Sequence, residues 1–528
     1  MGLFDILTNW ACYAMFYIFP LIAVAFLVYC LYIKHIHMKY DHIPGPPRDS
    51  FLFGHSTTVL EETRSDRNLH DKFLQWAEMY GPVVRINTLH VVFILVTCPE
   101  TTKKILMSPK YPKAKIVFKQ LHGLFGKRFL GSGLLTATNH KQWYKQRRIM
   151  DPAFSSLPRY NAFCADPKTS RLISRYLRGL MGNFNEGAEN LMDELTKLED
   201  SKKEAKMLEL VRRVTLDVLT KVAFGRDLDL NKNKDSPFPR AIEACLKGMV
   251  PTLRDILFQL MPKNRPFVKE VREACQLLRT TGEAWISKRR TAVQNGEDVP
   301  KDILTQIIKS AGQEEKMTKE DEDVMLDNFV TIFIAGQDTT GSQLAFCIME
   351  LGRNPDIMQK AQKEVDAVLG MKQEISYDDL GELTYLSQVL KETLRLYPSA
   401  PGTSREIPED MTISGIHIPA GVVGRFDSYV CGRMETFFKD PLTFDPDRFQ
   451  PDAPKPYYCY YPFGLGPRSC LGQKFAQMEA KVVMAKLLQR FEFSLVPGQS
   501  FGILDTATLS PKSGVVCNIK HRNPNILQ

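Results

Sequence analysis

The sequence predicts a mainly α-helical protein, and three stretches carry that prediction. Residues 11–33 are almost all apolar, residues 326–351 form a second long apolar stretch, and a glycine-rich loop at 463–472 leads into a helix that should begin near Gln473. The chain of 528 residues, 44% of them hydrophobic, can bury a large core. Because no internal repeat, long Gly/Ser linker or low-complexity run divides it, we expect one large folded unit.

The N-terminus contains a candidate membrane anchor. No charged residue lies between Asp5 and Lys34, and about 20 apolar residues are enough to cross a bilayer as a helix. Pro20 would kink such a helix but need not stop it. Lys34 and Lys39 follow the apolar run, so the positive-inside rule places the body of the protein in the cytosol. A cleaved signal peptide is the alternative, but the run is too long for one and no small-residue cleavage site follows it.

These features divide the chain into three parts. We expect a signal-anchor transmembrane helix at residues 1–33 and a basic, proline-rich hinge at residues 34–50. The hinge contains Ile43-Pro44-Gly45-Pro46-Pro47, which cannot extend the helix. Residues 51–528 then form a single domain.

Charge and cysteine content argue against several classes of protein. The formal charge of +9 is modest for this length, so we interpret it as local basic patches and not as a nucleic-acid-binding surface. One such patch is residues 140–148, for which a solvated helix face is the alternative. The 11 cysteines are irregularly spaced and include no Cys-x-x-Cys pair. This argues against a zinc module and against the disulfide framework of a secreted protein.

Cys470 is the most informative residue of the chain. It lies in a glycine-rich loop before a predicted helix, where the positive end of the helix dipole and unpaired backbone N–H groups stabilise a thiolate. Gly464 and Gly472 leave room for a flat macrocycle against the main chain, and Arg468 is placed to pair with an acidic group at its edge. One thiolate can hold one iron, and a thiolate ligand on haem favours cleavage of the O–O bond. The alternative is a surface turn with a structural cysteine.

Five residues of this loop match a known motif. Phe463, Gly466, Arg468, Cys470 and Gly472 follow the pattern Phe-x-x-Gly-x-Arg-x-Cys-x-Gly, so the loop resembles the haem-binding loop of the cytochrome P450 superfamily. The resemblance extends over essentially the whole chain. It implies a mainly α fold with a smaller β-rich region (α+β), and haem b whose iron is held by the Cys470 thiolate. It further implies a monooxygenase that receives NADPH-derived electrons through a flavoprotein reductase.

The second apolar stretch predicts one long helix that is buried on most faces. Its middle, Ala335-Gly336-Gln337-Asp338-Thr339-Thr340, contains poor helix formers, which suggests a locally widened turn. The alternative is close packing against a neighbouring helix. The segment resembles the family's Ala/Gly-Gly-x-Asp/Glu-Thr-Thr motif. That resemblance implies that Thr339 delivers protons toward bound oxygen, that Asp338 supports this relay, and that Ala335 and Gly336 line the oxygen and substrate side of the haem.

A second motif predicts a structural ion-pair cluster. Glu392 and Arg395 lie three residues apart on a helix that ends before Pro398. The alternative is an exposed ion pair that contributes little to the stability of the protein, although the flanking leucines indicate a partly buried site. The two residues resemble the family's Glu-x-x-Arg pair, and Arg448 lies in a stretch that resembles its Pro-Glu-Arg-Phe motif. The resemblance implies that all three form a structural triad behind the thiolate loop.

Further basic residues are candidates for contacts with haem propionates. Trp143 and Arg147 are four apart and share one face of a helix. They resemble the family's Trp-x-x-x-Arg pair, whose members hydrogen-bond a propionate. Arg405 falls where the family often places another propionate-binding arginine on a strand. The resemblance also implies that the lysines and arginines around Trp143 form the face on which the reductase docks.

Several longer stretches resemble the cholesterol 24-hydroxylase family, among them Tyr385–Glu392 and Phe475–Arg490. The resemblance implies hydroxylation of a sterol side chain, and it places the protein at the endoplasmic reticulum membrane with its catalytic domain in the cytosol. That family has His-Glu-Thr-Ser where this chain has Gln337-Asp338-Thr339-Thr340, and His at Pro467. The shorter relay carboxylate puts the coupling of electrons to product in question.

By analogy with the family's topology, several residues are candidates for contacts with a hydrophobic substrate. They are Leu121, Phe125, Ala335, Gly336, Ala400, Thr403 and Thr506. The residues leave other functions open: a monooxygenase of another lipid or xenobiotic, a haem-thiolate isomerase or dehydratase of hydroperoxides, and a haem carrier or sensor. The intact Asp338–Thr339 pair argues against the isomerase or dehydratase, and a carrier would need no relay.

Overall fold

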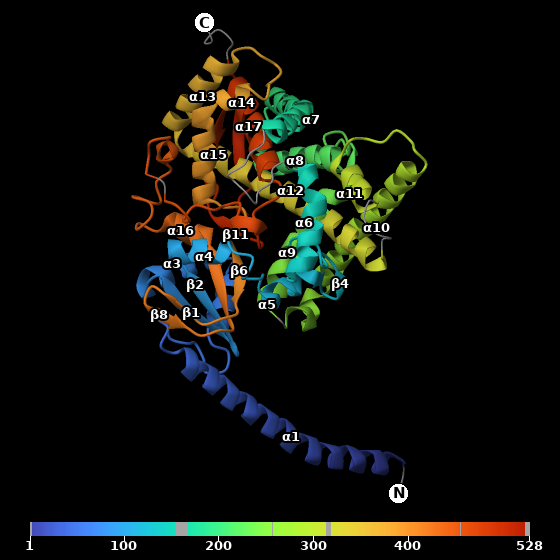
Figure 1. Ribbon diagram of the computed structural model, residues 1–528, viewed down its shortest axis with the longest axis vertical. Coiled ribbons are helices and arrows are strands. Elements are labelled where there is room, and N and C mark those ends of the chain that lie inside the picture. The colour runs from blue at the N-terminus through green and yellow to red at the C-terminus, as the bar shows by residue number, and fades with distance from the viewer. Residues whose placement is uncertain (1–2, 155–166, 256, 313–317, 455, 523–528) are drawn as a thin grey trace.

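Helices make up most of the chain, and the main sheet lies at one side of the molecule, next to the base of the N-terminal helix (Figure 1). The computed structural model describes residues 3–154, 167–255, 257–312, 318–454 and 456–522. The mainly α architecture with a smaller β-rich region agrees with the expected fold class.

The helices follow one another along the chain with short connections. They are α1 (Leu3–Tyr40), α2 (Ser56–Arg64), α3 (Leu69–Tyr80), α4 (Pro99–Leu106), α5 (Lys115–Phe118), α6 (His140–Phe154), α7 (Pro167–Asp200), α8 (Met207–Phe224), α9 (Pro237–Arg254), α10 (Arg265–Gln294), α11 (Ile303–Gly312), α12 (Lys319–Arg353), α13 (Pro355–Leu369), α14 (Asp379–Glu382), α15 (Thr384–Leu396), α16 (Ser428–Arg433) and α17 (Gln473–Arg490). Short 3-10 turns include η1 (Gln120–His122), η2 (Phe258–Leu260), η3 (Pro262–Asn264), η4 (Pro446–Phe449) and η5 (Gly466–Arg468).

The strands form one four-stranded sheet and several smaller ones. They are β1 (Val83–Thr88), β2 (Val91–Val96), β3 (Gly123–Leu124), β4 (Lys127–Arg128), β5 (Ala205–Lys206), β6 (Gly402–Ile407), β7 (Met411–Ile413), β8 (Ile416–Ile418), β9 (Val422–Asp427), β10 (Phe491–Leu495), β11 (Ile503–Asp505), β12 (Leu509–Pro511) and β13 (Val516–His521). The main sheet has the order β1-β2-β9-β6, with β2 and β9 parallel and the other pairs antiparallel. A three-stranded sheet has the order β10-β13-β5, and β11 pairs with β12 in a hairpin.

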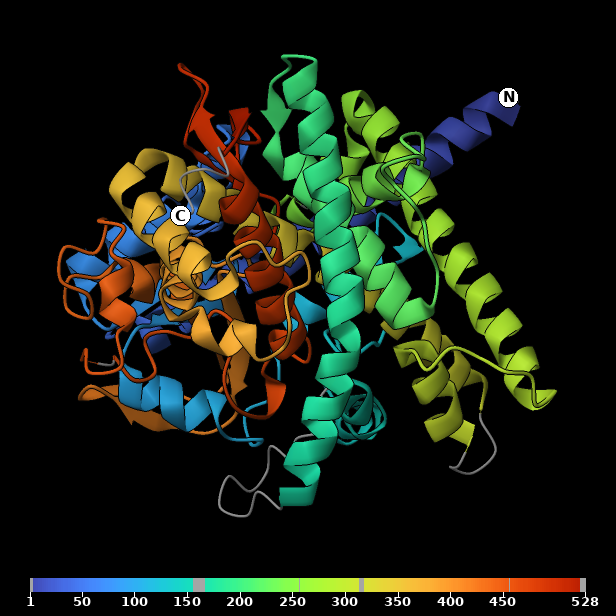
Figure 2. The ribbon, with the colours of Figure 1, turned by 90° about the horizontal axis from the view of Figure 1, so that it is seen from above.

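The core is organised around α12, the long helix predicted from the second apolar stretch. It begins at a reciprocal cap between Thr318 and Asp321, which satisfies backbone N–H groups of its first turn. It packs against α8, α10, α15 and α17. Glycines permit these close approaches: a Cβ on Gly282 of α10 would lie 2.6 Å from Leu326. Seen from above, α7 lies between the group α13, α15 and α17 and the group α8 to α10 (Figure 2).

Helix α1 continues to Tyr40, seven residues into the segment expected to be a hinge. From Phe16 to Val28 its described side chains are exposed, but farther along Ile33, His37 and Tyr40 are buried. Because residues three to four apart share one helix face, the last turns of α1 lie against the body of the protein. The Tyr40 hydroxyl there donates to the carbonyl of Ala420 at 3.2 Å.

The proline-rich segment after α1 is fixed along strand β1. The Arg85 N–H donates to the carbonyl of Pro44 at 2.7 Å, and the imidazole Nε2 of His55 lies 3.1 Å from the carbonyl oxygen of Pro46. Glycine is required at position 45, since a Cβ there would lie 2.5 Å from the Arg85 carbonyl oxygen. The segment therefore connects α1 to the sheet as a fixed strap and not as a loose linker.

We predict that Ile33→Ala destabilises the body of the protein, because Ile33 is fully buried against it. The expected loss is about 2–5 kcal/mol of unfolding free energy, as for truncation of buried aliphatic side chains to alanine. Leu31→Ala is the matched control, since Leu31 is 59% exposed on another face of the same helix. Thermal unfolding of the full chain in lipid nanodiscs, followed by tryptophan fluorescence, measures the effect. Equal midpoints for the two variants would contradict a docked α1.

Candidate active site

Cys470 lies between a short 3-10 turn and the start of α17, as the sequence predicted for this loop. Its N–H donates to the carbonyl of Phe463 at 2.7 Å, and the N–H of Ser469 donates to that of Gly466 at 3.1 Å. These two bonds fold the loop back on itself and leave the Cys470 side chain exposed. The sulfur is thus held near the positive end of α17, where a thiolate is favoured.

The loop glycines have different roles. Gly464 and Gly466 adopt φ of +69° and +65°, a region that favours glycine. Gly466 is also restricted by packing, because a Cβ there would lie 2.4 Å from the carbonyl oxygen of Leu106 at the end of α4. A Cβ on Gly472 would meet no atom within 4 Å. The space beside Gly472 is open, as expected if a flat group lies against this turn.

Three cations come together near the loop: Lys113 and Arg405, which are buried, and Arg468, which is half-buried. Their recorded hydrogen bonds go to uncharged oxygens. Lys113 Nζ donates to the Leu135 carbonyl at 2.6 Å, Arg405 Nη1 donates to the Thr403 hydroxyl at 2.8 Å, and Arg468 Nη1 donates to a backbone carbonyl at 2.8 Å. Within the part of the chain that the structure describes, none of the three cations pairs with a carboxylate.

The energetics of this cluster point to an anionic ligand. Burial, together with the charges of Arg405 and Arg468, holds the pKa of Lys113 well below its usual value. Burial lowers the pKa of Arg405 to about 10, and burial and the neighbouring Arg405 and Arg147 lower that of Arg468 to about 9. An unpaired buried charge is costly. Two carboxylates, such as haem propionates, would supply the missing negative charge, so the residues present fit haem.

Trp143 and Arg147 share the inner face of α6, as predicted. Trp143 is buried, and the guanidinium of Arg468 lies 4.1 Å from the centre of its ring, a stacking contact that aligns the arginine. Arg147 donates to the Ser469 carbonyl at 2.9 Å, directly before Cys470. Its Nε also lies 2.6 Å from a carboxylate oxygen of Asp151. Arg147 therefore supports the thiolate loop, and its contact with a propionate stays a prediction.

One stripe of α12 is open while the rest of its middle is buried. Ile332, Ala335, Gly336 and Thr339 are exposed or half-buried, at the three- and four-residue spacing of a single helix face. The Thr339 hydroxyl donates to the carbonyl of Ala335 at 2.8 Å, the back-bonding expected for threonine in a helix. For Gly336 the packing alternative also holds, since a Cβ there would lie 2.6 Å from Leu219 of α8.

Asp338 is fully buried and forms an ion pair with Arg212 of α8. The guanidinium of Arg212 also lies 3.4 Å from the hydroxyl of Ser342, one turn farther along α12. The carboxylate adjacent to Thr339 is thus held on the α8 side of the helix. To serve a proton relay it would have to exchange the arginine for water or for a protonated partner.

The comparisons with known proteins agree with this geometry. The family model described as Cytochrome P450 matches residues 44–518. Cytochrome P450 4d2 of Drosophila melanogaster is 29% identical over 473 residues, covering 85% of this chain and 88% of its own length. Human Cytochrome P450 4B1 is 29% identical over 503 residues, covering 92% and 91%, and rabbit (Oryctolagus cuniculus) Cytochrome P450 3A6 is 28% identical over 497 residues, covering 90% and 91%.

The chain belongs to the cytochrome P450 family. It is therefore an oxidoreductase of the monooxygenase type, which binds haem through a cysteine thiolate and receives its electrons from a reductase. Cys470 is our prediction for that cysteine. Relatives from the P450 4 and 3A groups match almost equally well. They show the superfamily, and the particular resemblance to cholesterol 24-hydroxylases has no support among them.

The expected structural triad of this cytochrome P450 is brought together behind the thiolate loop. Arg395 forms two parallel bonds with Glu392, of 2.7 Å from Nε and 2.6 Å from Nη2, and both side chains are fully buried. Arg448 lies 3.4 Å from the same carboxylate. Arg395 also donates to the carbonyls of Gly432 and Thr443. Because every polar atom of this buried pair has at least one partner, it fixes α15 to the segment before Cys470.

The predicted substrate contacts come from four regions of the chain. Ala335 lies on the open stripe of α12, and Ala400 is exposed just beyond α15. A bond from the Ser399 hydroxyl to the Thr339 carbonyl, 2.8 Å, holds these two segments together. Thr403 is half-buried beside Arg405, and Thr506 lies in the β11–β12 turn. Leu121 is buried in the core, and Phe125 stacks on Phe258 at 5.9 Å.

Sequence reasoning missed two residues of the site. Lys113 follows a proline in a loop and matches no motif, and only its pairing with Arg405 of β6 reveals it. Arg212 is one of two adjacent arginines on α8, and its ion pair with Asp338 depends on how α8 crosses α12. No signal in a single sequence identifies either one.

We predict that Cys470→Ala abolishes the thiolate-type absorption spectrum of the reduced carbon monoxide complex, because the only soft anionic ligand in the loop is lost. Cys98→Ser is the control, since Cys98 is a half-buried cysteine at the start of α4. Circular dichroism should show unchanged helicity in both variants. A Cys470→Ala protein that keeps the thiolate spectrum would refute the ligand assignment.

We predict that Lys113→Met weakens haem binding, because one propionate would lose a buried cationic partner. Removing one member of a buried charge pair corresponds to an increase of about tenfold or more in the dissociation constant. Lys110→Met is the control: Lys110 is exposed and pairs with Glu409 on the surface. Titration of the haem-free protein with hemin, followed by absorbance, measures both. Equal affinities for hemin in the two variants would show that Lys113 takes no part in haem binding.

Proposed function

We propose that this protein is a membrane-anchored cytochrome P450 that hydroxylates a hydrophobic lipid, with the side chain of a sterol as the most specific candidate. The observation that carries the proposal is the open stripe of α12, where Thr339 stands beside a buried acid on the same helix as apolar Ala335. When bound, haem supplies the metal centre at which oxygen is activated. The chain supplies the proton-handling groups, the apolar walls and the charges that hold the cofactor.

Thr339 and Asp338 have distinct positions in this scheme. The Thr339 hydroxyl already donates its hydrogen to the Ala335 carbonyl, so its oxygen is available to accept a hydrogen bond from water or substrate. Asp338 is held by Arg212 away from that hydroxyl. Proton transfer then requires Asp338 to exchange partners, which would make Arg212 a control on the rate of the step.

Two observations support a sterol or similar lipid with few polar groups. The predicted contacts are mostly apolar, and the longer stretches of sequence resemble sterol side-chain hydroxylases. In the β11–β12 turn the Thr508 hydroxyl is buried and has no hydrogen-bond partner among the described residues. A single hydroxyl on an otherwise apolar ligand would satisfy it. Another lipid or a xenobiotic is the alternative.

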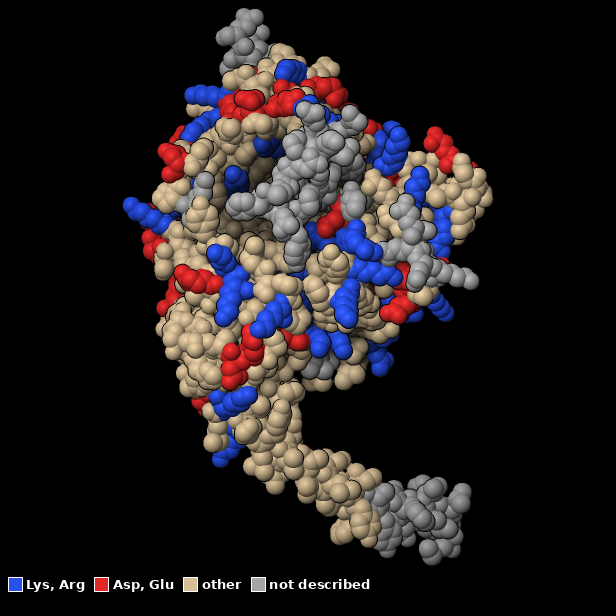
Figure 3. Space-filling view, in the orientation of Figure 1, with Lys and Arg blue, Asp and Glu red and all other residues tan. Residues whose placement is uncertain are grey.

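The proposed location is the endoplasmic reticulum membrane, with the catalytic domain on the cytosolic side. The segment of α1 from residue 16 to residue 40 is long enough and apolar enough to cross a bilayer. Over the part of α1 whose side chains are described, Figure 3 shows no charged side chain on the visible face until the helix nears the body. Exposed apolar side chains on the body, Phe51, Phe53, Leu257 and Leu260, would add contacts with the bilayer surface.

The exposed face of α6 is the proposed docking site for the NADPH-dependent reductase. Lys141, Lys145 and Arg148 are exposed, while Trp143 and Arg147 on the opposite face are buried. A basic face of this kind increases the rate of association with an acidic partner.

The experiment that tests the function uses the full chain in nanodiscs with hemin, reductase and NADPH. Cholesterol and a long-chain fatty acid are supplied separately, and products are identified by mass spectrometry. Side-chain-hydroxylated sterol formed only with reductase supports the proposal. If only the fatty acid is oxidised, the proposed sterol substrate is wrong and the substrate is another lipid. Conversion of a lipid hydroperoxide without reductase would instead establish the isomerase or dehydratase.

We predict that Thr339→Ala lowers the product formed per NADPH by about a hundredfold, the lower end of the range for a group that assists proton transfer. Electrons should be diverted to hydrogen peroxide while the substrate-induced absorption change is kept. Thr331→Ala is the matched control, because Thr331 forms the same kind of back-bond, to the Asp327 carbonyl at 2.8 Å, on the buried side of the helix. Unchanged product yield in Thr339→Ala would exclude the relay role.

A further inference from the structure

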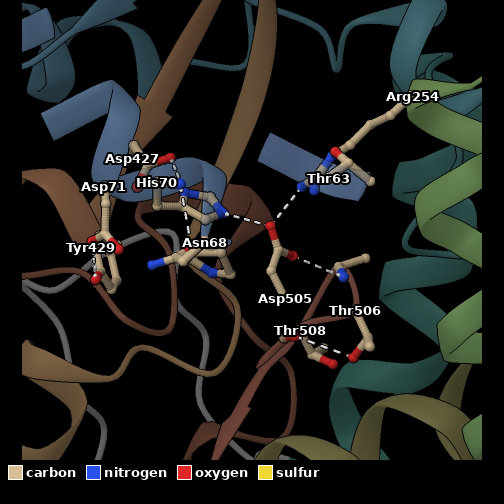
Figure 4. Close-up of polar contacts among 12 residues, drawn as sticks. Thr63, Asn68, His70, Asp71, Arg254, Asp427, Tyr429, Asp505, Thr506 and Thr508 are labelled. Atoms are coloured by element: carbon tan, nitrogen blue, oxygen red, sulfur yellow. Dashed lines mark hydrogen bonds and ion pairs between the residues drawn. The ribbon is translucent and has the colours of Figure 1, made fainter. Parts of the chain in front are cut away.

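A buried ionic cluster links four segments that lie far apart in the sequence (Figure 4). His70 at the start of α3 has its Nδ1 2.8 Å from a carboxylate oxygen of Asp427, at the end of β9. Its Nε2 lies 3.7 Å from a carboxylate oxygen of Asp505, at the end of β11. Asp505 in turn pairs with Arg254, the last residue of α9, at 2.7 Å. The cluster therefore joins the main sheet, the β11–β12 hairpin and α9.

The charges in this cluster balance pair by pair. Asp427 is bound by Arg425 at 3.0 Å and Asp505 by Arg254. Side-chain exposure is 0% for Asp427 and 2% for Asp505, so neither carboxylate is solvated. Burial alone would raise the pKa of Asp505, but Arg254 and His70 hold it below its usual value. Loss of one arginine would leave a buried carboxylate without its counter-ion, which is strongly unfavourable.

Asp505 also shapes the turn that follows it. One carboxylate oxygen accepts from the N–H of Ala507 at 3.1 Å, and Ala507 has a φ of +71°. Within the same turn the N–H of Thr506 donates to the Thr508 carbonyl at 2.9 Å. The bond from the Ala507 N–H to the Asp505 carboxylate is the kind of side-chain-to-backbone bond with which aspartate fixes tight turns. The placement of Thr506 therefore depends on where the Asp505 carboxylate is held.

The turn is connected to the oxygen side of the site as well. Leu509, the first residue of β12, donates its N–H to the Ser399 carbonyl at 2.9 Å. The Ser399 hydroxyl donates to the carbonyl of Thr339 at 2.8 Å. Two hydrogen bonds thus lead from the hairpin to the residue proposed to deliver protons. On the other side, α9 packs against η1, which contains Leu121, and against β3.

We propose that Asp505 is a positioning residue for the substrate. Its ion pair with Arg254, which we call the Arg254–Asp505 clasp, holds the Thr506 turn between α9 and the open stripe of α12. The proposal rests on the proposed function, because it needs a substrate between these walls. The clasp sets the position of the substrate relative to Thr339 and hence which carbon is oxidised. Arg254 lies at the C-terminal end of α9, where a cation is also favoured by the helix dipole.

The test compares four single variants with the wild type. Each is studied as the full chain in nanodiscs with hemin and reductase. Asp505→Asn keeps the shape of the side chain without its charge, Arg254→Met removes the partner, and Arg254→Lys keeps a cation. Asp255→Asn is the control, because Asp255 lies next to the clasp but pairs at 3.0 Å with Arg64, which is largely exposed. Three quantities are measured: the dissociation constant from the substrate-induced absorption change, the distribution of oxidised positions, and amide hydrogen exchange of residues 503–511.

The expected result separates positioning from mere support of the fold. Asp505→Asn and Arg254→Met should each weaken substrate binding by about tenfold and broaden the distribution of oxidised positions, in line with the loss of a buried charge partner. Amide exchange in the turn should rise in both. Arg254→Lys should restore the wild-type product distribution, and Asp255→Asn should match the wild type. A fifth protein, the double variant Asp505→Asn/Arg254→Met, should be no worse than Asp505→Asn alone, because both changes break one interaction.

The proposal is overturned if Asp505→Asn keeps the wild-type affinity and product distribution even though exchange in the turn rises, since the clasp would then support only the fold. It is also overturned if exchange is unchanged. Failure of the proposed function has a different signature: the wild type would then oxidise neither lipid. In that case the exchange pattern across the four variants would still support or refute the Arg254–Asp505 clasp.

Discussion

Uncompensated positive charge is the constraint on which the candidate site depends. Lys113 and Arg405 are buried and Arg468 is half-buried, and the nearby arginine charges lower the pKa of Lys113 and of Arg468. Only uncharged oxygens accept the hydrogen bonds of these three side chains. Inside a protein such an arrangement is unfavourable by several kcal/mol for each uncompensated charge. A fold can retain it when a bound group supplies the missing anions. The carboxylates of haem meet that requirement, so the protein and its cofactor form one electrostatic unit.

This constraint links cofactor binding to the stability of the fold. The three cations come from a loop before α5, from strand β6 and from the thiolate loop, so the bound carboxylates would tie together segments that are distant in the chain. Any ligand that binds only the folded state stabilises that state. Bound carboxylates would also neutralise the three cations, which removes the repulsion among these cations in the haem-free protein. The Glu392–Arg395 pair acts differently, since its charges are already matched and its role is to hold α15 in place.

The sequence alone was sufficient for features whose partners lie close together in the chain. The thiolate loop, the start of α17 at Gln473 and the three-residue spacing of Glu392 and Arg395 are local patterns, and the structure contains each of them. Lys113 and Arg212 could not be predicted in this way, because each acquires its role from a partner that only the tertiary fold brings near.

The same reasoning explains two further differences. The apolar run predicts a helix but not its end, because the continuation of α1 to Tyr40 depends on contacts with the body that no hydropathy pattern contains. Gly336 matches a motif for lining the oxygen side, yet its missing side chain also faces Leu219 of α8. A motif residue can therefore be required for packing and for function at once, and sequence cannot separate the two.

The main sheet gives these separate features a common base. The strap after α1 is bonded to β1, and β1 is joined through β2 to β9. Strand β9 ends at Asp427, which holds His70 and, through it, the end of the β11–β12 hairpin. Sheets transmit position well because each strand is fixed to its neighbours by a ladder of hydrogen bonds, whereas a flexible linker would not. The apolar helix α1, our proposed membrane anchor, and the turn proposed to position substrate are therefore attached to one rigid element.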